Sequence, residues 1–424
     1  MANTLKFGSG QWATKVGSTL AYNDENGNFK PLPFNFTRST GGTRVNKNGL
    51  IEVVTNNKPR IDFLNDSNGA LLLEPSRSNL VNYSEDFSNA AWLKSNNPTI
   101  TSNIAIAPDG TQTANGIQDI NGVNLKSVSQ SFSVNSNSTA TISIFVKKEL
   151  TNTNFGGLML YFSGGTVKYV YGIIDEVNGV INIAPQSVIG SSSTKVEDYG
   201  TYWRFSLSGT DNGSNNTARF QYYASFSTNG TDVTGNAIGS LRTLWGSQLE
   251  LGSYATSYRP TQGAIATRVA EVCNNAGNAT VFNSLEGVLY INTAALTQSG
   301  ENRWISIHDN TGNNDVELRY TSNTNQIRCK YVIGSVAIAD VFFTVTDATQ
   351  FSKIAFKWAS SDFALWIDGV EVATSLTGAT SNVAFDELSF DVSNLGSTNF
   401  YGNTKNVRVY NTALTESELI ALTT

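Results

Sequence analysis

Short segments in which apolar and polar residues alternate recur along most of the chain, and they limit the fold more than any other feature. In TATISIFVKK (139–148), Ile142, Ile144 and Val146 fall on one face of an extended segment, because successive side chains of a strand point to opposite sides. Turn signals rich in Asn and Gly separate such segments. A series of short strands joined by turns is typical of β-sandwiches and jelly rolls. The sequence therefore predicts an all-β protein.

Length and composition narrow the class further. The 424 residues are too many for one core and predict two or three domains. Aromatic residues make up 11%, which excludes a disordered chain. The net charge is −6 and Lys and Arg form no cluster, so we expect no nucleic-acid partner. No apolar run approaches the roughly 20 residues of a membrane span, so we expect no membrane insertion. The segment MANTLKFGSG also lacks the apolar core of a secretory signal.

The turn and strand signals divide the chain into regions of different character. The first region consists of small hairpins with little core of its own, the second and fourth contain longer alternating strands, and the third has the composition of a linker. We expect an attachment and oligomerisation region, a jelly roll, a linker and a second sandwich at residues 1–82, 83–262, 263–280 and 281–424.

Local signals predict three further features of the chain. Asp368-Gly369 lies between alternating segments and predicts a hairpin. Residues 415–422 carry the one convincing helix signal, because Thr415 and Glu418 have the spacing of a capping box. Leu414 and Leu419 are placed to pack across the start of this helix. The two cysteines, Cys273 and Cys329, are expected to be free and buried.

Several motifs in order resemble the virion surface proteins of tailed phages. They are FNFTRSTGGTRVNKNGLIEVV, PRIDFLNDSNGALLLEPSRSNLVNYSEDFSNAAW and LWGSQLELGSYATSYRPTQGAIATR, which together span roughly residues 1 to 270. Relatives of this kind are head-fibre and tail-fibre proteins. The resemblance implies a protein made in the host cytoplasm and displayed on the virion surface. It also implies contact with other virion proteins through residues 1–82, and a homo-oligomer, with a trimer favoured.

Two parts of the chain resemble known carbohydrate-associated folds. The middle block is similar to a carbohydrate-binding-module jelly roll. The tail, with FALWIDGVEVAT followed by FYGNTKNVRVYNTALTESEL, resembles the laminin-G/concanavalin A-like sandwich. The resemblance implies adhesion to host-surface or mucosal glycans. The alternatives are a polysaccharide depolymerase fibre and a purely structural capsid decoration protein.

The stretch ALLLEPSRSNLVNYSEDFSNAAW (70–92) marks a junction in this scheme. Leu71 to Leu73 predict a buried strand, and Pro75 ends its pairing. Ser84 is predicted to cap a turn that brings Phe87 and Trp92 into the next core. We interpret the segment as the point where the attachment region meets the jelly roll. An ordinary interdomain loop is the alternative.

Catalytic signals are weak, so we expect no enzyme. The single histidine, His308, is not accompanied by a G-x-S-x-G motif and is expected to be a solvated or packed side chain. Glycoside hydrolysis needs two facing carboxylates, and the E-x-D-x-x-E pattern of concanavalin-like hydrolases is missing. Asp315 with Glu317, and Asp175 with Glu176, are more simply edge or turn carboxylates.

Sugar binding needs aromatic rings that stack on a pyranose, together with polar groups. Tyr169 and Tyr171 share a face by alternation, and one of the adjacent Tyr222 and Tyr223 should face outward. The full set of glycan-binding candidates is Tyr169, Tyr171, Trp203, Tyr222, Tyr223, Trp304, Arg319 and Trp366.

No cofactor is predicted, although the resemblance leaves room for a structural calcium ion. The carboxylates that the resemblance suggests for it are Asp86, Asp109 and Glu250. This set is incomplete, because Gln248 stands where the jelly-roll families often have an acid.

Overall fold

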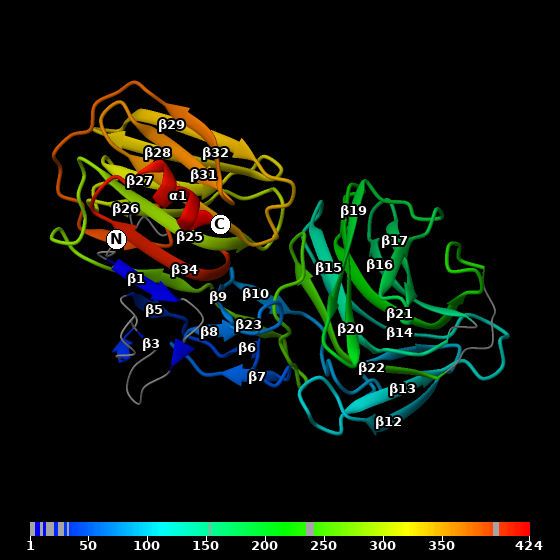
Figure 1. Cartoon of the computed structure of the whole chain (residues 1–424). Helices are drawn as coiled ribbons and strands as arrows, with labels where there is room; N and C mark the ends of the chain where they lie inside the picture. Colours follow the sequence, from blue (N-terminus) through cyan, green and yellow to red (C-terminus); the bar gives the residue numbers. More distant parts are fainter. Residues whose placement is uncertain are drawn as a thin grey trace. The chain divides into compact units, whose positions relative to one another are not determined.

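The structure is a computed structural model, and it describes residues 5–8, 12–13, 21–23, 29–31, 34–151, 154–234, 241–392 and 398–424. The described residues are almost entirely β, with a short helix near the C-terminus (Figure 1). This confirms the all-β prediction. The chain divides into two compact units, each assembled from separate segments of the sequence. Unit 1 comprises residues 1–41, 54–75 and 269–424, and unit 2 comprises residues 42–53 and 76–268.

Unit 2 is a sandwich of two six-stranded antiparallel sheets, as expected for a jelly roll. Sheet F has the order β11 (Leu93–Ser95), β14 (Ser127–Ser133), β21 (Thr217–Ser227), β16 (Phe155–Ser163), β17 (Lys168–Asp175) and β18 (Val180–Ile183). Sheet G has the order β12 (Thr99–Ala105), β13 (Ala114–Gln118), β22 (Arg242–Leu251), β15 (Thr139–Lys147), β20 (Tyr202–Thr210) and β19 (Ser191–Asp198). Two short pairs complete the unit, β6 (Gly42–Val45) with β7 (Ile51–Val54) and β10 (Arg77–Asn79) with β23 (Ala266–Arg268).

The core of unit 2 lies between these sheets and is formed by alternate residues of each strand. Ile142, Ile144 and Val146 are fully buried there, as their alternation predicts. Phe87 and Trp92 join the same core with ring centroids 4.9 Å apart. The prediction that these two rings enter the second domain is therefore confirmed.

Unit 1 is a second sandwich. Its larger sheet has the order β32 (Val370–Ser375), β31 (Phe363–Ile367), β30 (Ser352–Trp358), β25 (Gly287–Ala295), β34 (Gly402–Tyr410), β9 (Ala70–Leu73) and β8 (Arg60–Asp62), with β1 (Leu5–Gly8) also paired to β34. Its smaller sheet has the order β29 (Val336–Thr344), β28 (Gln326–Ile333), β27 (Asp315–Tyr320), β26 (Arg303–His308) and β33 (Glu387–Ser389). The remaining strands are β24 (Val272–Asn274) with β5 (Asn35–Thr37), and β2 (Trp12–Ala13), β3 (Ala21–Asn23) and β4 (Phe29–Pro31).

Strands from the first 82 residues complete the larger sheet of unit 1, which corrects the expected domain boundaries. Figure 1 shows β1 beside β34, although they lie at opposite ends of the sequence, and Leu5 pairs with Val409. Leu71 pairs with Thr404 in the same way. Residues 1–82 are therefore not a separate region, because β1, β8 and β9 belong to the larger sheet of unit 1, whereas β6, β10 and most of β7 belong to unit 2. Residues 9–11, 14–20, 24–28 and 32–33 of this region lie outside the described residues.

Residues 263–280 are not the expected linker, because they contain a buried ionic centre of unit 1. Glu271 accepts hydrogen bonds from Arg38 Nη1 at 2.6 Å, Arg60 Nε at 2.8 Å and the Glu74 backbone N–H at 2.9 Å. Arg60 also pairs with Glu74 at 2.8 Å. All four side chains are at most 3% exposed. We call this set the Glu271 network, and it joins three distant segments of the sequence.

Pro75 lies at a boundary between the two units, and Ser84 acts differently from the prediction. Unit 1 ends one of its segments at Pro75 and unit 2 resumes at Ser76. Ser84 does not cap a turn. It is buried, and its hydroxyl oxygen accepts the Thr261 N–H at 2.9 Å and shares a hydrogen bond with the Tyr258 hydroxyl at 2.7 Å. The reason is its position against the chain segment that leaves β22.

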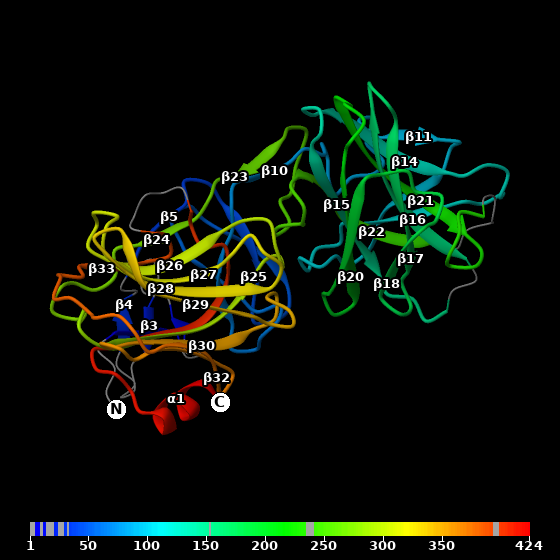
Figure 2. The ribbon, with the colours of Figure 1, turned by 90° about the horizontal axis from the view of Figure 1, so that it is seen from above.

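The predicted local features of unit 1 are confirmed. Helix α1 (Glu416–Thr423) begins after Thr415, whose N–H donates to Glu418 at 2.9 Å, and Figure 2 shows the helix beside the larger sheet. Leu414 and Leu419 pack in a second apolar cluster with that sheet. The Asp368-Gly369 hairpin joins β31 to β32. Cys273 and Cys329 are free, and burial raises the pKa of both thiols.

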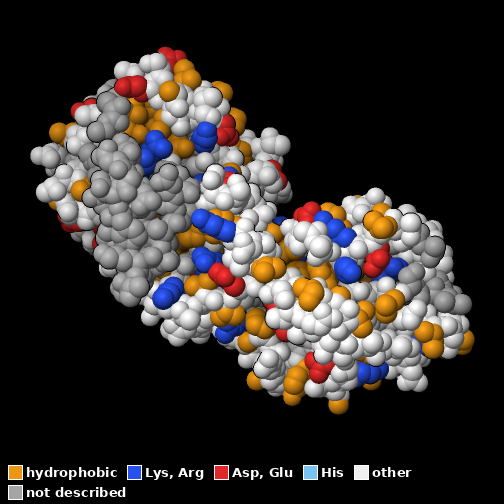
Figure 3. Space-filling model, turned by 60° about the horizontal axis from the view of Figure 1, so that its bottom comes forward, with side chains coloured by type: hydrophobic (Ala, Val, Ile, Leu, Met, Phe, Trp, Pro, Cys, Tyr) orange, Lys and Arg blue, Asp and Glu red, His pale blue; other side chains and the backbone are white. Residues whose placement is uncertain are grey.

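Charged side chains are sparse on the surface. Figure 3 shows one face on which Lys and Arg side chains are scattered and interspersed with Asp and Glu. Within the described ranges, no helix is long and apolar enough to cross a membrane.

Candidate functional site

An aromatic surface covers part of the outer side of sheet F in unit 2. Cross-strand register places Tyr161 of β16 opposite Tyr169 of β17, and Met159 opposite Tyr171. Tyr223 of β21 lies across from Gly157. We call the side chains of Tyr161, Tyr169, Tyr171, Arg219, Tyr223 and Phe226 the aromatic face. Tyr169 and Tyr171 lie on one side of the strand, as alternation predicts.

The rings of the aromatic face form a continuous chain of contacts. Tyr161 stacks on Tyr169 with centroids 6.3 Å apart, and Tyr169 contacts Tyr171 at 4.9 Å. Tyr171 meets the edge of Phe226 at 5.3 Å, and Phe226 stacks on Tyr223 at 4.4 Å. Such mutual contacts fix the side-chain rotamers before any ligand binds, which lowers the entropic cost of binding.

The tyrosines of this face differ in their exposure. Tyr161, Tyr169 and Tyr171 are half-buried, and none of their hydroxyl groups has a hydrogen-bond partner among the described residues. Burial raises the pKa of Tyr171, and it raises the pKa of Tyr223 to about 12. Tyr223 is 9% exposed and its hydroxyl contacts the sulfur of Met159 at 3.8 Å. The hydroxyl groups of the three half-buried tyrosines are therefore available to an external ligand. Tyr223 is buried instead, and it packs against Phe226, which contacts Tyr171.

Arg219 gives one end of the aromatic face a positive charge. Its guanidinium lies 4.2 Å from the centroid of the Tyr161 ring. Ser131 is its cross-strand neighbour on the other side, and Ser131 is exposed. Gln221 lies two residues further along β21, and its amide donates to Ser127 at 2.7 Å. The result is a polar corner of Ser131, Arg219 and Gln221 next to the tyrosines.

The other two candidates of unit 2 serve its core. Tyr222 is fully buried between the sheets, whereas Tyr223 faces the outer side of sheet F, as alternation predicts, but is only 9% exposed. Both faces of β21 are covered, one by the core and the other by the aromatic face. The ring of Trp203 packs against the core, its indole N–H donates to the Glu176 carbonyl at 3.0 Å, and Lys148 Nζ lies 3.7 Å from its ring centroid. This ring is occupied by protein contacts.

The candidates of unit 1 are also largely buried. Trp304 is 9% exposed, and its indole N–H donates to Glu317 at 3.1 Å. The Arg319 guanidinium lies 5.0 Å from the centroid of its ring. Trp304 and Arg319 are therefore brought together, as cross-strand neighbours on β26 and β27. Trp366, in contrast, lies in the cluster beneath helix α1 at 4% exposure, because that helix covers its side of the larger sheet.

Three of the four carboxylates considered as catalytic candidates are buried, although all were expected to be edge or turn groups. Asp315 and Glu317 are 3% and 8% exposed in the interior of the smaller sheet. His308 is fully buried, and its Nε2 atom lies 3.4 Å from Glu387 Oε1. Burial lowers the pKa of His308, although the negative charge of Glu387 acts to raise it. Glu176 is buried and pairs with Arg242. Burial of these groups leaves little access for a polysaccharide.

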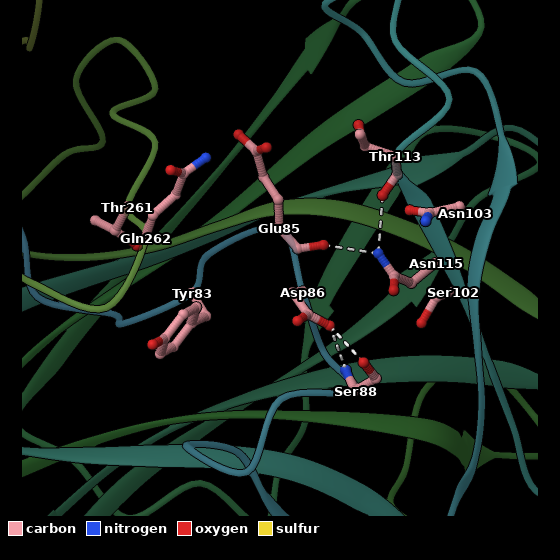
Figure 4. A pocket seen from close by; sticks show the side chains of 10 residues that line it. All are labelled: Tyr83, Glu85, Asp86, Ser88, Ser102, Asn103, Thr113, Asn115, Thr261 and Gln262. Atoms are coloured by element: carbon pink, nitrogen blue, oxygen red, sulfur yellow. Dashed lines mark hydrogen bonds between the residues drawn. The ribbon is translucent and has the colours of Figure 1, made fainter.

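A polar pocket of about 410 Å³ also lies in unit 2 (Figure 4). It is lined by Tyr83, Glu85, Asp86, Ser88, Ser102, Asn103, Thr113, Asn115, Thr261 and Gln262. Burial raises the pKa of Glu85, although its hydrogen bond from Tyr258 opposes this shift. The lining contains two carboxylates and no lysine or arginine, so the pocket favours hydrogen-bond donors over anions. Sequence reasoning missed this pocket, because its residues come from β12, β13 and separate loops.

The carboxylates suggested for calcium are engaged in separate contacts. Asp86 accepts the Ser88 N–H at 3.0 Å, and Glu250 accepts the Thr256 N–H at 2.9 Å. Gln248 accepts a hydrogen bond from the Arg259 N–H at 2.7 Å. It therefore has a structural role at the position where the jelly-roll families often have an acidic residue. Among the described residues, no group of three or more His, Cys, Asp or Glu side chains could hold a metal ion.

A comparison with protein-family models finds a match in the C-terminal part of unit 1. Residues 287–420 match the model of the concanavalin A-like lectin/glucanases superfamily. No curated protein matches the chain. Among solved structures, the carbohydrate-binding module CBM40 of the Ruminococcus gnavus IT-sialidase, bound to α2,3-sialyllactose, has 17% identity and a TM-score of 0.31 over 36% of this chain and 94% of that one.

Two further solved structures are similar at the same low level. Domain 4 of the GH43 arabinanase AbnA from Geobacillus stearothermophilus, in complex with arabinotriose, has 16% identity and a TM-score of 0.30 over 41% of this chain and 84% of that one. Mouse laminin α1 domains LG4-5 have 12% identity and a TM-score of 0.26 over 71% and 88%. Such scores are too low to carry a functional argument. The family match shows only that residues 287–420 are similar to the concanavalin A-like lectin/glucanases superfamily.

Proposed function

We propose that this protein is a non-catalytic glycan-binding protein and that the aromatic face is its sugar site. The observation that carries the proposal is the continuous row of Tyr161, Tyr169 and Tyr171, whose hydroxyl groups have no hydrogen-bond partner among the described residues. Tyrosine rings supply apolar area for the C–H surface of a sugar, and their hydroxyls supply hydrogen bonds. A site of this kind on a rigid sheet needs little reorganisation to bind.

The biological setting that we propose is the surface of a tailed-phage virion, as a head or tail fibre that adheres to host-surface or mucosal glycans. The support is the ordered resemblance of residues 1 to 270. We further propose contact with neighbouring virion proteins through residues 1–82, and a homotrimer. Labelling virions with a specific antibody for electron microscopy, and light scattering of the purified chain, test these two points. Unlabelled particles or a clean monomer would contradict them.

A binding measurement tests the proposed site. Tyr171→Ala removes one ring of the row, and we expect its loss to weaken glycan binding by about 1 kcal/mol, or roughly fivefold. The matched control is Tyr222→Phe, which alters β21 of the same sheet only inside the core. A glycan array identifies the ligand, and calorimetry then compares the variants. Equal binding by Tyr171→Ala and the native chain would contradict the proposed site.

The absence of catalysis is a separate part of the proposal. The support is the burial of the carboxylates of the smaller sheet, Asp315 and Glu317 among them. Incubation of the intact chain with capsular polysaccharides should release no reducing ends. Steady release of reducing ends, lost in a Glu317→Gln variant, would instead make the protein a depolymerase.

A further inference from the structure

We infer that the aromatic face selects glycans that carry an anionic group, a carboxylate or a sulfate, and that Arg219 is the residue that recognises it. This inference rests on the proposed sugar site and deepens it, because it names the class of sugar.

Arg219 has no acidic partner among the residues that the structure describes. No carboxylate of the described residues lies within ion-pair distance of its guanidinium, and its Nε atom is buried without a hydrogen-bond partner. Its cross-strand neighbours are Ser131 on one side and Tyr161 on the other, neither of which carries a charge. In a chain of net charge −6, other arginines such as Arg60 and Arg328 are paired with acids.

Arg219 is held in place for a ligand. Its guanidinium carbon lies over the Tyr161 ring, 4.2 Å from the centroid, and its charge opposes the raised pKa of both Tyr171 and Tyr223. Because Nε is buried, the two terminal nitrogens of the guanidinium are the groups that can donate parallel hydrogen bonds to a carboxylate or sulfate. Its position beside the ring row allows one sugar to contact ring and charge together.

Two uncharged polar side chains, Gln221 and Ser131, lie next to Arg219. Gln221 has an amide oxygen that is buried and lacks a hydrogen-bond partner, and Ser131 offers an exposed hydroxyl. The exposed Ser131 hydroxyl can bind a hydroxyl of the same sugar that gives its anionic group to Arg219, whereas the Gln221 oxygen is closed to solvent. The polar pocket of Figure 4 has the opposite character, because its two acids, Glu85 and Asp86, would repel an anion.

The test uses the intact chain and matched pairs of oligosaccharides in calorimetry. One pair is an oligogalacturonate and its methyl ester, and the other is a sulfated galactan oligosaccharide and its desulfated form. We expect the anionic member of at least one pair to bind about tenfold more tightly or better. The pair that shows the preference identifies the anion as carboxylate or sulfate.

Three variants place the preference on Arg219. Arg219→Gln should make the affinities for the anionic and the neutral member of each pair equal. The affinity for the neutral member should change less than about threefold. Arg219→Lys should keep only part of the preference, because an ammonium group lacks the bidentate edge. Lys195→Gln is the control, since this exposed lysine lies on β19 of the other sheet.

The outcomes separate this inference from the proposed function. Equal binding of both members of each pair by the native chain would overturn the inference and leave the sugar site standing. A preference that survives Arg219→Gln would overturn the assignment to Arg219. Failure of all four oligosaccharides, together with an empty glycan array, would overturn both.

Discussion

Replacement of Glu271 by Gln is the most informative test of how unit 1 is held together. The substitution keeps the shape of the side chain but removes the negative charge that faces Arg38 and Arg60. Arg60 retains Glu74 at 2.8 Å, and Arg38 retains contacts that include the Thr40 carbonyl at 2.8 Å and the Phe36 ring. The Glu271 network then changes from a balanced set of two arginines and two glutamates to one with an uncompensated buried positive charge.

The expected cost follows from the burial of this charge. Breaking a buried ion pair by removal of one partner costs about 3–5 kcal/mol of unfolding free energy. For a domain of about 150–250 residues, this corresponds to a fall in Tm of roughly 6–20 °C. Urea unfolding of the full chain, followed by tryptophan fluorescence, measures the change, and an unaltered slope with denaturant shows that compactness is unchanged.

A matched control separates burial from the mere presence of an ion pair. Asp340→Asn breaks the pair with Arg328, whose side chains are 33% and 31% exposed in the same unit. Exposed pairs contribute about 0–1 kcal/mol, so this control should change the unfolding free energy little. A Glu271→Gln loss no larger than that of the control would refute the reasoning.

Three further predictions follow from the structure. Burial alone would raise the pKa of Asp211, but N–H donors from Asn137, Gly213 and Asn215 lower it. A lowered pKa adds stability above the unfolded value of about 3.9 and loses it as the pH falls through the folded value. Asp211→Asn should therefore lower the unfolding free energy by about 1.5–3 kcal/mol at pH 7. Urea titrations at several pH values should show that the native chain and the variant become closer in stability below about pH 4. A stability difference that does not change with pH would contradict this prediction. A chain of residues 83–424 lacks β1, β8 and β9 and leaves Glu271 without Arg38 and Arg60. We expect it to aggregate or to lose a cooperative melting transition in circular dichroism, and a soluble, cooperatively folded product would argue against the assigned pairing. A methyl group at Gly157 would collide with the Phe226 ring, so Gly157→Ala should lower the unfolding free energy by about 1–3 kcal/mol through overpacking. The variant should also bind glycan more weakly, and urea denaturation and calorimetry measure the two effects. An affinity equal to that of the native chain would show that Phe226 does not support the site.

Much of the fold could be predicted from the sequence, because the signals are local. Alternation identified the strands, Asp368-Gly369 identified a hairpin, and Thr415 with Glu418 identified the helix start. Pairing between distant segments could not be predicted. Leu71 pairs with Thr404, and Glu271 with Arg38, through contacts that no short window of sequence records. The assumed linker therefore contained a buried charge centre.

The candidate site was predicted only in part for the same physical reason. Alternation along one strand placed Tyr169 and Tyr171 together. The addition of Tyr161 and Arg219 depends on the register between β16, β17 and β21. Exposure depends on what covers each face, and this removed Tyr222 and Trp366 from the surface.

The measurement that tests the central claim most directly is a crystal structure of the intact chain with an oligosaccharide selected on the glycan array. We predict a sugar ring in contact with Tyr161, Tyr169 or Tyr171 on the outer side of sheet F. A sugar bound only in the pocket lined by Tyr83 and Asn115, or only on unit 1 beside Trp304, would contradict the account.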